Sequence, residues 1–278
     1  MDLSKYVTKR QATSLLLKGR PGLSMLEDGL TLARQLLATS DLDRHPDFLM
    51  IAPLSNKKTI GVDEIMPVIS LGAYPPVHGK YSIALIDSMD KLTDVAQNKL
   101  LILLETNPYV FVIGICYGEV LDTVKSRMRV ISYHPSTKTD FLNACNLPAE
   151  DGELFYYATG GCIGFLDELE SEKKLFYALR DACSADEKRK WLFPALHLVK
   201  EKDKQAITEN PFLMQSVLRL LQFLFHQQSE KAYMERDFHK AERYNDITAR
   251  LIEDEKRSGQ SAYNKNDYFA TILYCVEH

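Results

Sequence analysis

The sequence predicts an α/β protein in which a parallel sheet flanked by helices precedes a region made of helices alone. Between residues 12 and 133, short apolar runs alternate with helical patterns, as is typical of a sheet covered on both faces. After His134-Pro135 no further strand pattern follows. The composition agrees, because 45% hydrophobic and 26% charged residues suit a chain that buries cores.

Five apolar runs in the first part have the length and composition of buried strands. Each is rich in Leu, Ile, Val or aromatic residues and is bounded by polar residues, Gly or Pro. The expected strands are Ser14–Leu17, Phe48–Ala52, Tyr81–Ile86, Val110–Ile115 and Met128–Tyr133.

Helical periodicity fills the gaps between these runs. Residues 26–37 and 96–104 place their apolar side chains on one helical face, and Thr93 is the expected N-cap of the second helix. Val62–Leu71 is also helical in pattern. Pro67 lies inside it and is expected to kink or shorten that helix, because proline lacks an N–H and clashes with the preceding turn.

Beyond residue 135 two kinds of helical pattern follow. Short segments separated by Pro148 and by Gly160-Gly161 are too small to fold without neighbours, which suggests a lid. Longer amphipathic helices such as Leu213–Leu224 then indicate a separate helical domain. The expected domains are residues 1–135, 136–171 and 172–278.

Charge, apolar-run length and cysteine content exclude several classes of protein. A net charge of −4 argues against a chain whose own surface field holds it on nucleic acid. No apolar run approaches the roughly 18 residues that a membrane helix needs, so no membrane contact is expected. The first residues lack a secretory pattern, and five scattered cysteines without a Cys-x-x-Cys pair indicate a reducing cytoplasm and no metal site.

A strand, a glycine-bearing loop and a helix follow one another where α/β nucleotide-binding proteins cradle phosphate. A working phosphate loop reads Gly-x-x-x-x-Gly-Lys-Ser/Thr, whose backbone N–H groups and Lys meet the phosphates and whose hydroxyl meets Mg²⁺. Here the loop offers Gly19, Gly22 and Ser24, and Met25 follows where a Lys is needed. We therefore predict a degenerate phosphate loop.

The next helical turn weakens nucleotide binding further. Glu27 or Asp28 would place negative charge near the β- and γ-phosphates of a bound nucleotide. We expect no ATP hydrolysis at this loop. The alternative is that Gly19 and Gly22 only turn the chain into a helix.

The expected third strand runs directly into Asp87, where an NTPase carries the aspartate that organises Mg²⁺. An active hydrolase commonly has an acidic base at the next position, and here that position is Ser88. Asp87 is therefore a candidate remnant of a magnesium motif. Alternatively, Asp87 and Asp90 are ordinary loop and N-cap acids.

Several segments follow one another in an order that points to one family. They are Thr59–Ile65, Ala84–Thr93, Ala96–Leu101, Leu103–Glu105 and Leu121–Arg127. Together with His45-Pro46-Asp47, they closely resemble bacterial clamp-loader subunits of DNA polymerase III, and best of all the delta-prime branch of that family. The resemblance is good over about residues 12–135, thinner through the expected lid and faint afterwards.

The resemblance implies an AAA+ module, consisting of an α/β domain and a small helical lid, joined to an all-α collar domain that oligomerises in a ring. It implies a subunit that does not hydrolyse ATP and requires no cofactor of its own. Its partners would be gamma/tau-type ATPase subunits and the delta subunit, and the assembly would load the sliding clamp on primed DNA. The family's Ser-Arg-Cys segment implies an arginine finger at Arg127, after Ser126, that reaches ATP bound by a neighbouring subunit.

Three departures from the family pattern are visible. Met128 stands where the family has Cys, and no four-cysteine zinc module lies between the first helix and the second strand. Gly164 is followed by Phe165 and Leu166, where ATP-binding relatives carry an Arg. A further nucleotide contact is therefore missing.

Other interpretations of the sequence stay open. Arg127 could instead complement the C-terminal dipole of a short helix, together with Lys125. The chain as a whole could be a diverged AAA+ ATPase with an unconventional phosphate loop, or a non-catalytic scaffold or adaptor that keeps the fold.

Overall fold

A computed structural model describes residues 3–7, 14–54, 59–145, 147–166, 173–184, 211–258 and 271 of the chain. The chain divides into two compact units, Met1–His134 and Pro135–His278, here called the N-terminal and C-terminal units. Each is described by itself.

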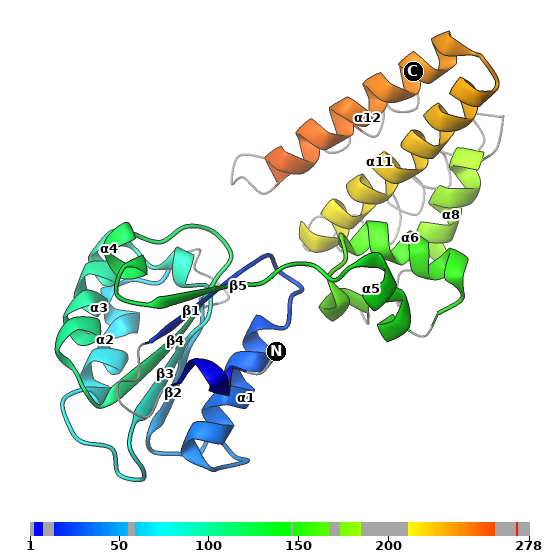
Figure 1. The fold of residues 1–278 in the computed structure, drawn as a ribbon. Helices are drawn as coiled ribbons and strands as arrows, with labels where there is room; N and C mark the ends of the chain where they lie inside the picture. Colours follow the sequence, from blue (N-terminus) through cyan, green and yellow to red (C-terminus); the bar gives the residue numbers. More distant parts are fainter. Residues whose placement is uncertain are drawn as a thin grey trace. The chain divides into compact units, whose positions relative to one another are not determined.

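The N-terminal unit contains a five-stranded parallel sheet in the order β2-β3-β4-β1-β5 (Figure 1). All five expected strands are confirmed, and each observed boundary lies within one residue of the expected one. The strands are β1 (Leu15–Lys18), β2 (Phe48–Ile51), β3 (Ser82–Ile86), β4 (Val110–Cys116) and β5 (Arg129–Ser132).

The register of the sheet fixes which segments meet at each edge. Leu15 at the start of β1 is paired with Ile113 and with Arg129, the first residue of β5. Lys18 at the end of β1 is paired with Cys116, the last residue of β4. Segments that follow β1 and β4 therefore lie at the carboxyl edge of the sheet, and the segment that precedes β5 lies at the opposite, amino edge.

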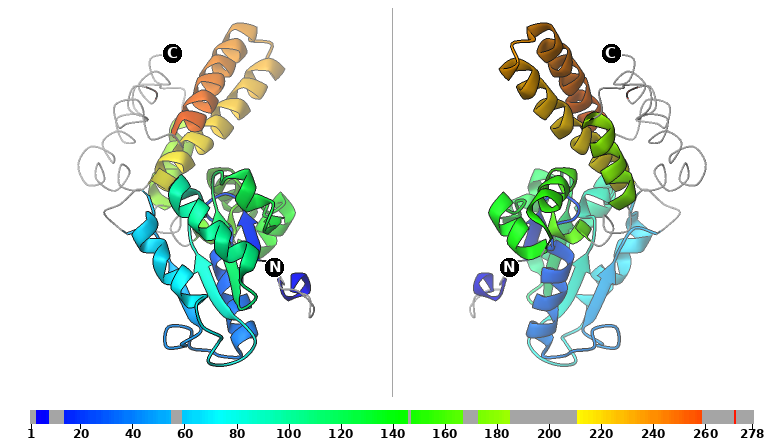
Figure 2. Two further views of the ribbon diagram at one scale, coloured as in Figure 1. Left: turned by 90° about the vertical axis from the view of Figure 1, so that its left-hand side faces the viewer. Right: turned by 90° about the vertical axis from the view of Figure 1, so that its right-hand side faces the viewer.

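Helices cover both faces of this sheet (Figures 1 and 2). Leu15 and Leu17 point into the core on the side of the first helix, whereas Leu16 points into the core on the other side. This alternation is the period of a strand buried on both faces. The helices are α1 (Met25–Leu37) on one face and α2 (Val62–Leu71), α3 (Asp94–Thr106) and α4 (Asp122–Lys125) on the other, with single 3₁₀ turns η1 (Ser4–Tyr6) and η2 (Met89–Lys91).

Two predictions about the helices, the N-cap at Thr93 and the effect of Pro67, can be compared with the structure. Thr93 is confirmed as the N-cap of α3, because its hydroxyl oxygen accepts a hydrogen bond from the Ala96 N–H at 3.3 Å. Pro67 was expected to kink or shorten α2. The shortening is wrong, since the helix runs from Val62 to Leu71 with the proline inside, and the kink stays a prediction. Burial of Ile65 and Val68 against the sheet offsets the missing backbone hydrogen bond.

We expect Pro67→Ala to stabilise the N-terminal unit by about 1–2 kcal/mol. The alanine N–H can bond to the carbonyl of Asp63 one turn earlier, and the gain is partly offset by the greater freedom of the unfolded chain. Chemical denaturation of both proteins measures the difference. Met66→Ala, at an exposed neighbour, is the matched control and should change stability by less than about 0.5 kcal/mol. Equal stability of the Pro67→Ala variant and the original chain would contradict the prediction.

The C-terminal unit is helical throughout its described part. In Figures 1 and 2 the two longest helices run side by side as a hairpin. Of the short segment expected after Gly160-Gly161, the structure describes a 3₁₀ turn, and residues 167–172 lie outside the described part. The elements are α5 (Lys138–Cys145), α6 (Ala149–Thr159), η3 (Ile163–Phe165), α8 (Lys173–Ser184), α11 (Pro211–Met234) and α12 (Phe238–Ser258).

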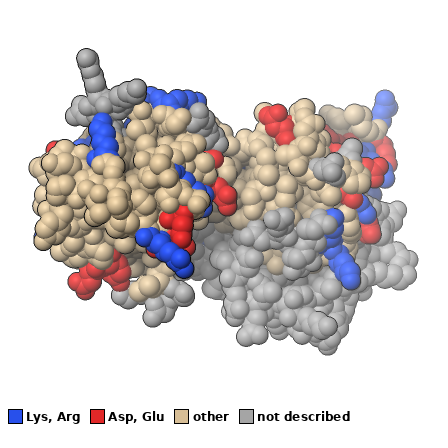
Figure 3. Space-filling model, turned by 90° about the horizontal axis from the view of Figure 1, so that it is seen from below, with Lys and Arg blue, Asp and Glu red and all other residues tan. Residues whose placement is uncertain are grey.

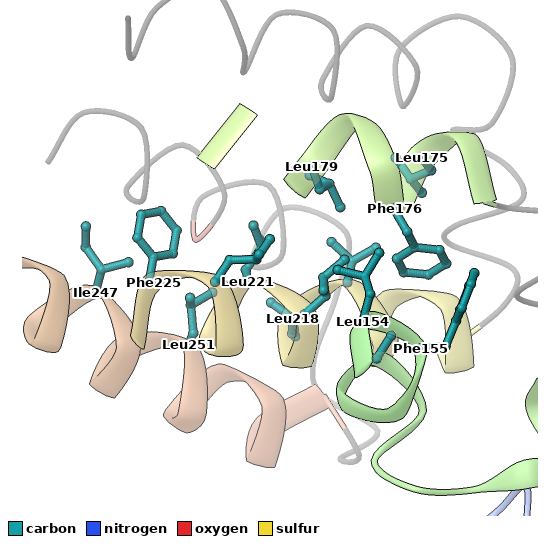
Figure 4. Close-up of a cluster of buried hydrophobic side chains, with 14 of the residues drawn as sticks. Leu154, Phe155, Leu175, Phe176, Leu179, Leu218, Leu221, Phe225, Ile247 and Leu251 are labelled. Carbon is teal, nitrogen blue, oxygen red and sulfur yellow. The ribbon is translucent and has the colours of Figure 1, made fainter. Parts of the chain in front are cut away.

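One apolar core joins the helices of the expected lid to those of the expected collar (Figure 4). Leu154 and Phe155 of α6 share it with Phe176 of α8, Leu218 of α11 and Leu251 of α12. The short helices are thus stabilised by the longer ones, as their length requires. The proposed boundary between residues 171 and 172 stays a prediction, and much of residues 172–278 lies outside the described part.

Among the described residues, no helix is long and apolar enough to cross a membrane.

Candidate functional site

The glycine-bearing loop lies at the carboxyl edge of the sheet, between β1 and α1. The N–H of Gly19 donates to the carbonyl of Cys116 at 3.1 Å, and Gly22 has a φ of +81°, which favours glycine. A Cβ on Gly19 would lie 2.9 Å from Leu23 Cδ1 and 3.0 Å from Tyr133 Cβ. Backbone geometry and packing alone therefore account for both glycines.

The side chain that replaces the phosphate-loop lysine is part of the core. Met25 is fully buried in the apolar cluster between α1 and the sheet. A Cβ on Gly19 would meet its sulfur at 3.0 Å, so the thioether lies directly beneath the loop. This position offers a nucleotide no cation.

An acid occupies the first turn of α1, where a phosphate would meet the helix N-terminus. Asp28 Oδ2 accepts hydrogen bonds from the Tyr133 hydroxyl at 2.8 Å and from the Ser24 hydroxyl at 3.3 Å. Burial and the bond to Asp28 raise the pKa of Tyr133. The Ser24 hydroxyl thus donates to a carboxylate of its own chain, and the negative charge of Asp28 opposes a bound phosphate.

Asp87 follows β3 at the same edge and faces a tyrosine that follows β4. Burial raises the pKa of Tyr117, and its hydrogen bond to Asp87 adds to the shift. Asp90 holds the backbone of the same residue, since its Oδ1 accepts from the Tyr117 N–H at 2.9 Å. Ser88 has a φ of 56° and places its hydroxyl 3.4 Å from Asp87 Oδ1. Both acids therefore support the loop after β4.

A chain of ion pairs extends from the end of β1 to α4. Glu119 Oε1 lies 2.5 Å from Lys18 Nζ, and its Oε2 lies 2.7 Å from Lys125 Nζ. Lys125 also pairs with Asp122 at 3.3 Å. Hydrogen bonds from Lys125 and then Lys18 lower the pKa of Glu119 to about 2.

We expect Lys125→Met to raise the pKa of Glu119 from about 2 toward its ordinary value of 4.5. The native pairing of Glu119 favours folding above its ordinary pKa, and that contribution is lost as the pH falls from about 4.5 to about 2. Carboxyl chemical shifts followed by NMR through this range measure the change. Lys99→Met, on the outer side of α3, is the control and should leave the midpoint unchanged; equal midpoints in both variants would contradict the prediction.

Arg127 lies at the opposite edge of the sheet. It follows α4 and precedes β5, whose first residue is level with the start of β1. Its Nη1 donates to the carbonyl of Thr123 at 2.9 Å and to Ser126 Oγ at 3.2 Å, and its Nη2 forms an ion pair with Glu105 of α3. The contact with Thr123 is the helix-end interaction that the alternative interpretation expects.

The structure therefore separates the candidate residues into two groups. Gly19, Gly22, Ser24 and Asp87 gather at the carboxyl edge, whereas Ser126 and Arg127 lie near the amino edge. The partners of these residues were not predicted from the sequence. Tyr117 and Tyr133 could have been found as tyrosines directly after expected strands, and Glu105 as an acid in the last turn of a helix.

The charges on one face of the molecule and the arrangement of potential metal ligands can be compared among the described residues. On the face drawn in Figure 3, the described basic and acidic side chains lie interspersed, and no continuous basic field is visible among them. Within the described residues, no group of three or more His, Cys, Asp or Glu side chains is arranged to hold a metal ion.

The parallel sheet, its flanking helices and the following helical region define an AAA+ fold of the clamp-loader type. Residues 4–137 match the model of the family described as DNA polymerase III, delta subunit. The matched residues cover nearly all of the N-terminal unit. No curated protein matches the chain significantly.

One solved structure shares the fold at low sequence identity, and two others are less similar. A DNA polymerase III gamma-subunit-related protein from Thermotoga maritima is 16% identical, with a TM-score of 0.57 over 99% of this chain and 97% of that one. The Bacillus subtilis DNA clamp loader delta protein is 12% identical, with a TM-score of 0.41 over 100% and 99% of the two chains. A variant of Thermotoga maritima RuvB is 13% identical, with a TM-score of 0.42 over 79% and 72%.

Proposed function

We propose that this chain is a delta-prime-like, non-hydrolysing subunit of the DNA polymerase III clamp loader. It works in the cytoplasm with gamma/tau-type ATPase subunits and the delta subunit, and the assembly loads the sliding clamp on primed DNA. The chain contributes Arg127 to ATP bound by the neighbouring subunit and needs no cofactor of its own.

The separation of Arg127 from the phosphate loop carries this proposal. β1 alone puts on the order of 10 Å between the two edges of the sheet. Arg127 therefore lies away from its own loop, which supports a role at a site on another chain. An arginine finger needs a permanently charged, planar donor at the surface, and the Arg127 side chain is 36% exposed.

The phosphate loop supports the absence of hydrolysis. Met25 puts a buried thioether where a lysine is needed, and Asp28 holds the hydroxyls of Ser24 and Tyr133. Asp87 faces Tyr117 rather than a second carboxylate. Residues 1–135 would then be the AAA+ α/β domain, residues 136–171 the lid and residues 172–278 the collar that joins the ring.

Two measurements on the purified chain test the proposal. Isothermal titration with Mg-ATP should give no tight binding, and the chain alone should not hydrolyse ATP. Mixed with clamp-loader ATPase and delta subunits, it should co-elute with them in size-exclusion chromatography. Tight binding and hydrolysis by the chain alone would refute the proposal and favour a diverged AAA+ ATPase.

A scaffold or adaptor is the second candidate function. The observation that favours it is that Thr123, Ser126 and Glu105 of its own chain already hold Arg127. In that case Arg127 only stabilises the end of α4. Failure to co-elute with any clamp-loader ATPase subunit would favour this candidate.

A further inference from the structure

The guanidinium of Arg127 is held by groups from two elements of the N-terminal unit. Its Nη1 donates to the carbonyl of Thr123 in α4 and to Oγ of Ser126 directly after α4, and its Nη2 pairs with Glu105 at the end of α3. Among the described residues, no partner is found for its Nε–H. A planar guanidinium fixed in this way keeps N–H donors for a further ligand, and such donors match the oxygens of a phosphate.

Helix stability does not explain the position of Glu105. This residue lies in the last turn of α3, which ends at Thr106 and carries no basic residue there. The carbonyl end of a helix disfavours a carboxylate, because the helix dipole is negative at that end. Its pairing with Arg127 offsets this disadvantage.

The ion pair also contributes little to folding by itself. The Arg127 and Glu105 side chains are 36% and 43% exposed, and exposed pairs are weak because water screens them. Removing Glu105 should therefore leave the unit folded. What the pair does change is the freedom of a long side chain, because a free arginine must lose its rotamer entropy when it binds.

We propose that Glu105 is a positioning residue for the arginine finger. With the Thr123 carbonyl and Ser126 Oγ, it fixes the plane of the Arg127 guanidinium, so that the remaining N–H groups meet the terminal phosphate of ATP held by the neighbouring subunit. This inference rests on the proposed function of Arg127. The ordering of the side chain then takes place in this chain before the subunits and ATP meet.

Steady-state ATP hydrolysis by the reconstituted, clamp- and DNA-stimulated assembly tests the proposal. Glu105→Ala should lower kcat by about 2–10-fold, because the side chain must be ordered during the reaction, and should leave KM for ATP unchanged. Glu105→Gln should stay within about twofold of the original rate, because the amide oxygen accepts the same hydrogen bond. Asp94→Ala, an exposed acid of the same helix, is the control and should behave as the original chain.

The double variant separates positioning from a structural role. Glu105→Ala should slow the Arg127→Ala assembly no further, since the finger on which it acts is gone. A further loss of rate in the Arg127→Ala background would overturn the positioning role. So would a Glu105→Ala assembly that hydrolyses ATP as fast as the original or faster. In either case a slow Arg127→Ala assembly would still support the proposed function. If Arg127→Ala left the rate unchanged, that result would overturn the proposed function itself. Thermal unfolding and size-exclusion chromatography check that each variant folds and assembles.

Discussion

Arg127→Ala is expected to lower clamp- and primed-DNA-stimulated ATP hydrolysis of the assembled clamp loader by about 10³-fold or more. Charge develops on the transferred phosphoryl group during hydrolysis, and a guanidinium supplied by the adjacent chain stabilises it. The residue lies at the amino edge of the sheet, away from its own phosphate loop, so the loss should appear at a neighbour's site. Rates at saturating ATP, clamp and DNA measure it.

Two further variants separate this role from general effects of charge. Arg127→Lys keeps the charge but loses the planar fork, so most of the loss should remain. Arg129→Ala is the matched control, because Arg129 is an exposed arginine nearby whose guanidinium lies 4.7 Å from the Tyr6 ring. It should leave the rate nearly unchanged. An unchanged rate for Arg127→Ala in an intact assembly would return Arg127 to a helix-end role.

The central strands of the sheet could be predicted closely because they are buried on both faces. β3 and β4 are buried along their whole length, so each is a continuous apolar run that ends where the chain leaves the core. Even β2, with only Ile51 fully buried, keeps an apolar sequence at the sheet edge. The order of the strands in the sheet could not be predicted, since a run of apolar residues does not indicate which strand lies beside it.

Predictions from short stretches of sequence failed where tertiary packing determined the structure. Pro67 breaks a backbone hydrogen bond, yet α2 continues because Ile65 and Val68 are buried on either side of it. In the C-terminal unit, the short helices α5 and α6 share one core with α11 and α12, a contact between residues far apart in sequence. A sequence read segment by segment does not contain that information.

The candidate site was predictable in its residues but not in their partners. The missing lysine, Asp87 and Arg127 follow from spacing and from the family resemblance. That Asp28 accepts from Tyr133, or that Glu105 pairs with Arg127, depends on elements brought together by folding, about 105 and 22 positions apart in the chain. The contact of Asp28 shows that the loop not only lacks nucleotide ligands but also forms hydrogen bonds within its own chain.

Met25→Lys is expected to destabilise the N-terminal unit by about 3–5 kcal/mol and not to restore ATP binding. The substitution rebuilds the lysine of the phosphate-loop pattern. Met25 is fully buried, however, with Gly19 and the core between α1 and the sheet around it, and an ammonium there has no partner. Denaturant unfolding measures the loss of stability, and titration with Mg-ATP measures binding.

Met25→Leu keeps the volume and the apolar character of the side chain, so it should cost less than about 1.5 kcal/mol. The contrast between the two variants isolates the buried charge from a change in packing. If Met25→Lys folded as stably as the original and bound Mg-ATP tightly, the loop would be a phosphate cradle lacking a single group. The carboxylate of Asp28 in the first turn of α1 argues against that outcome, because its negative charge opposes a bound phosphate.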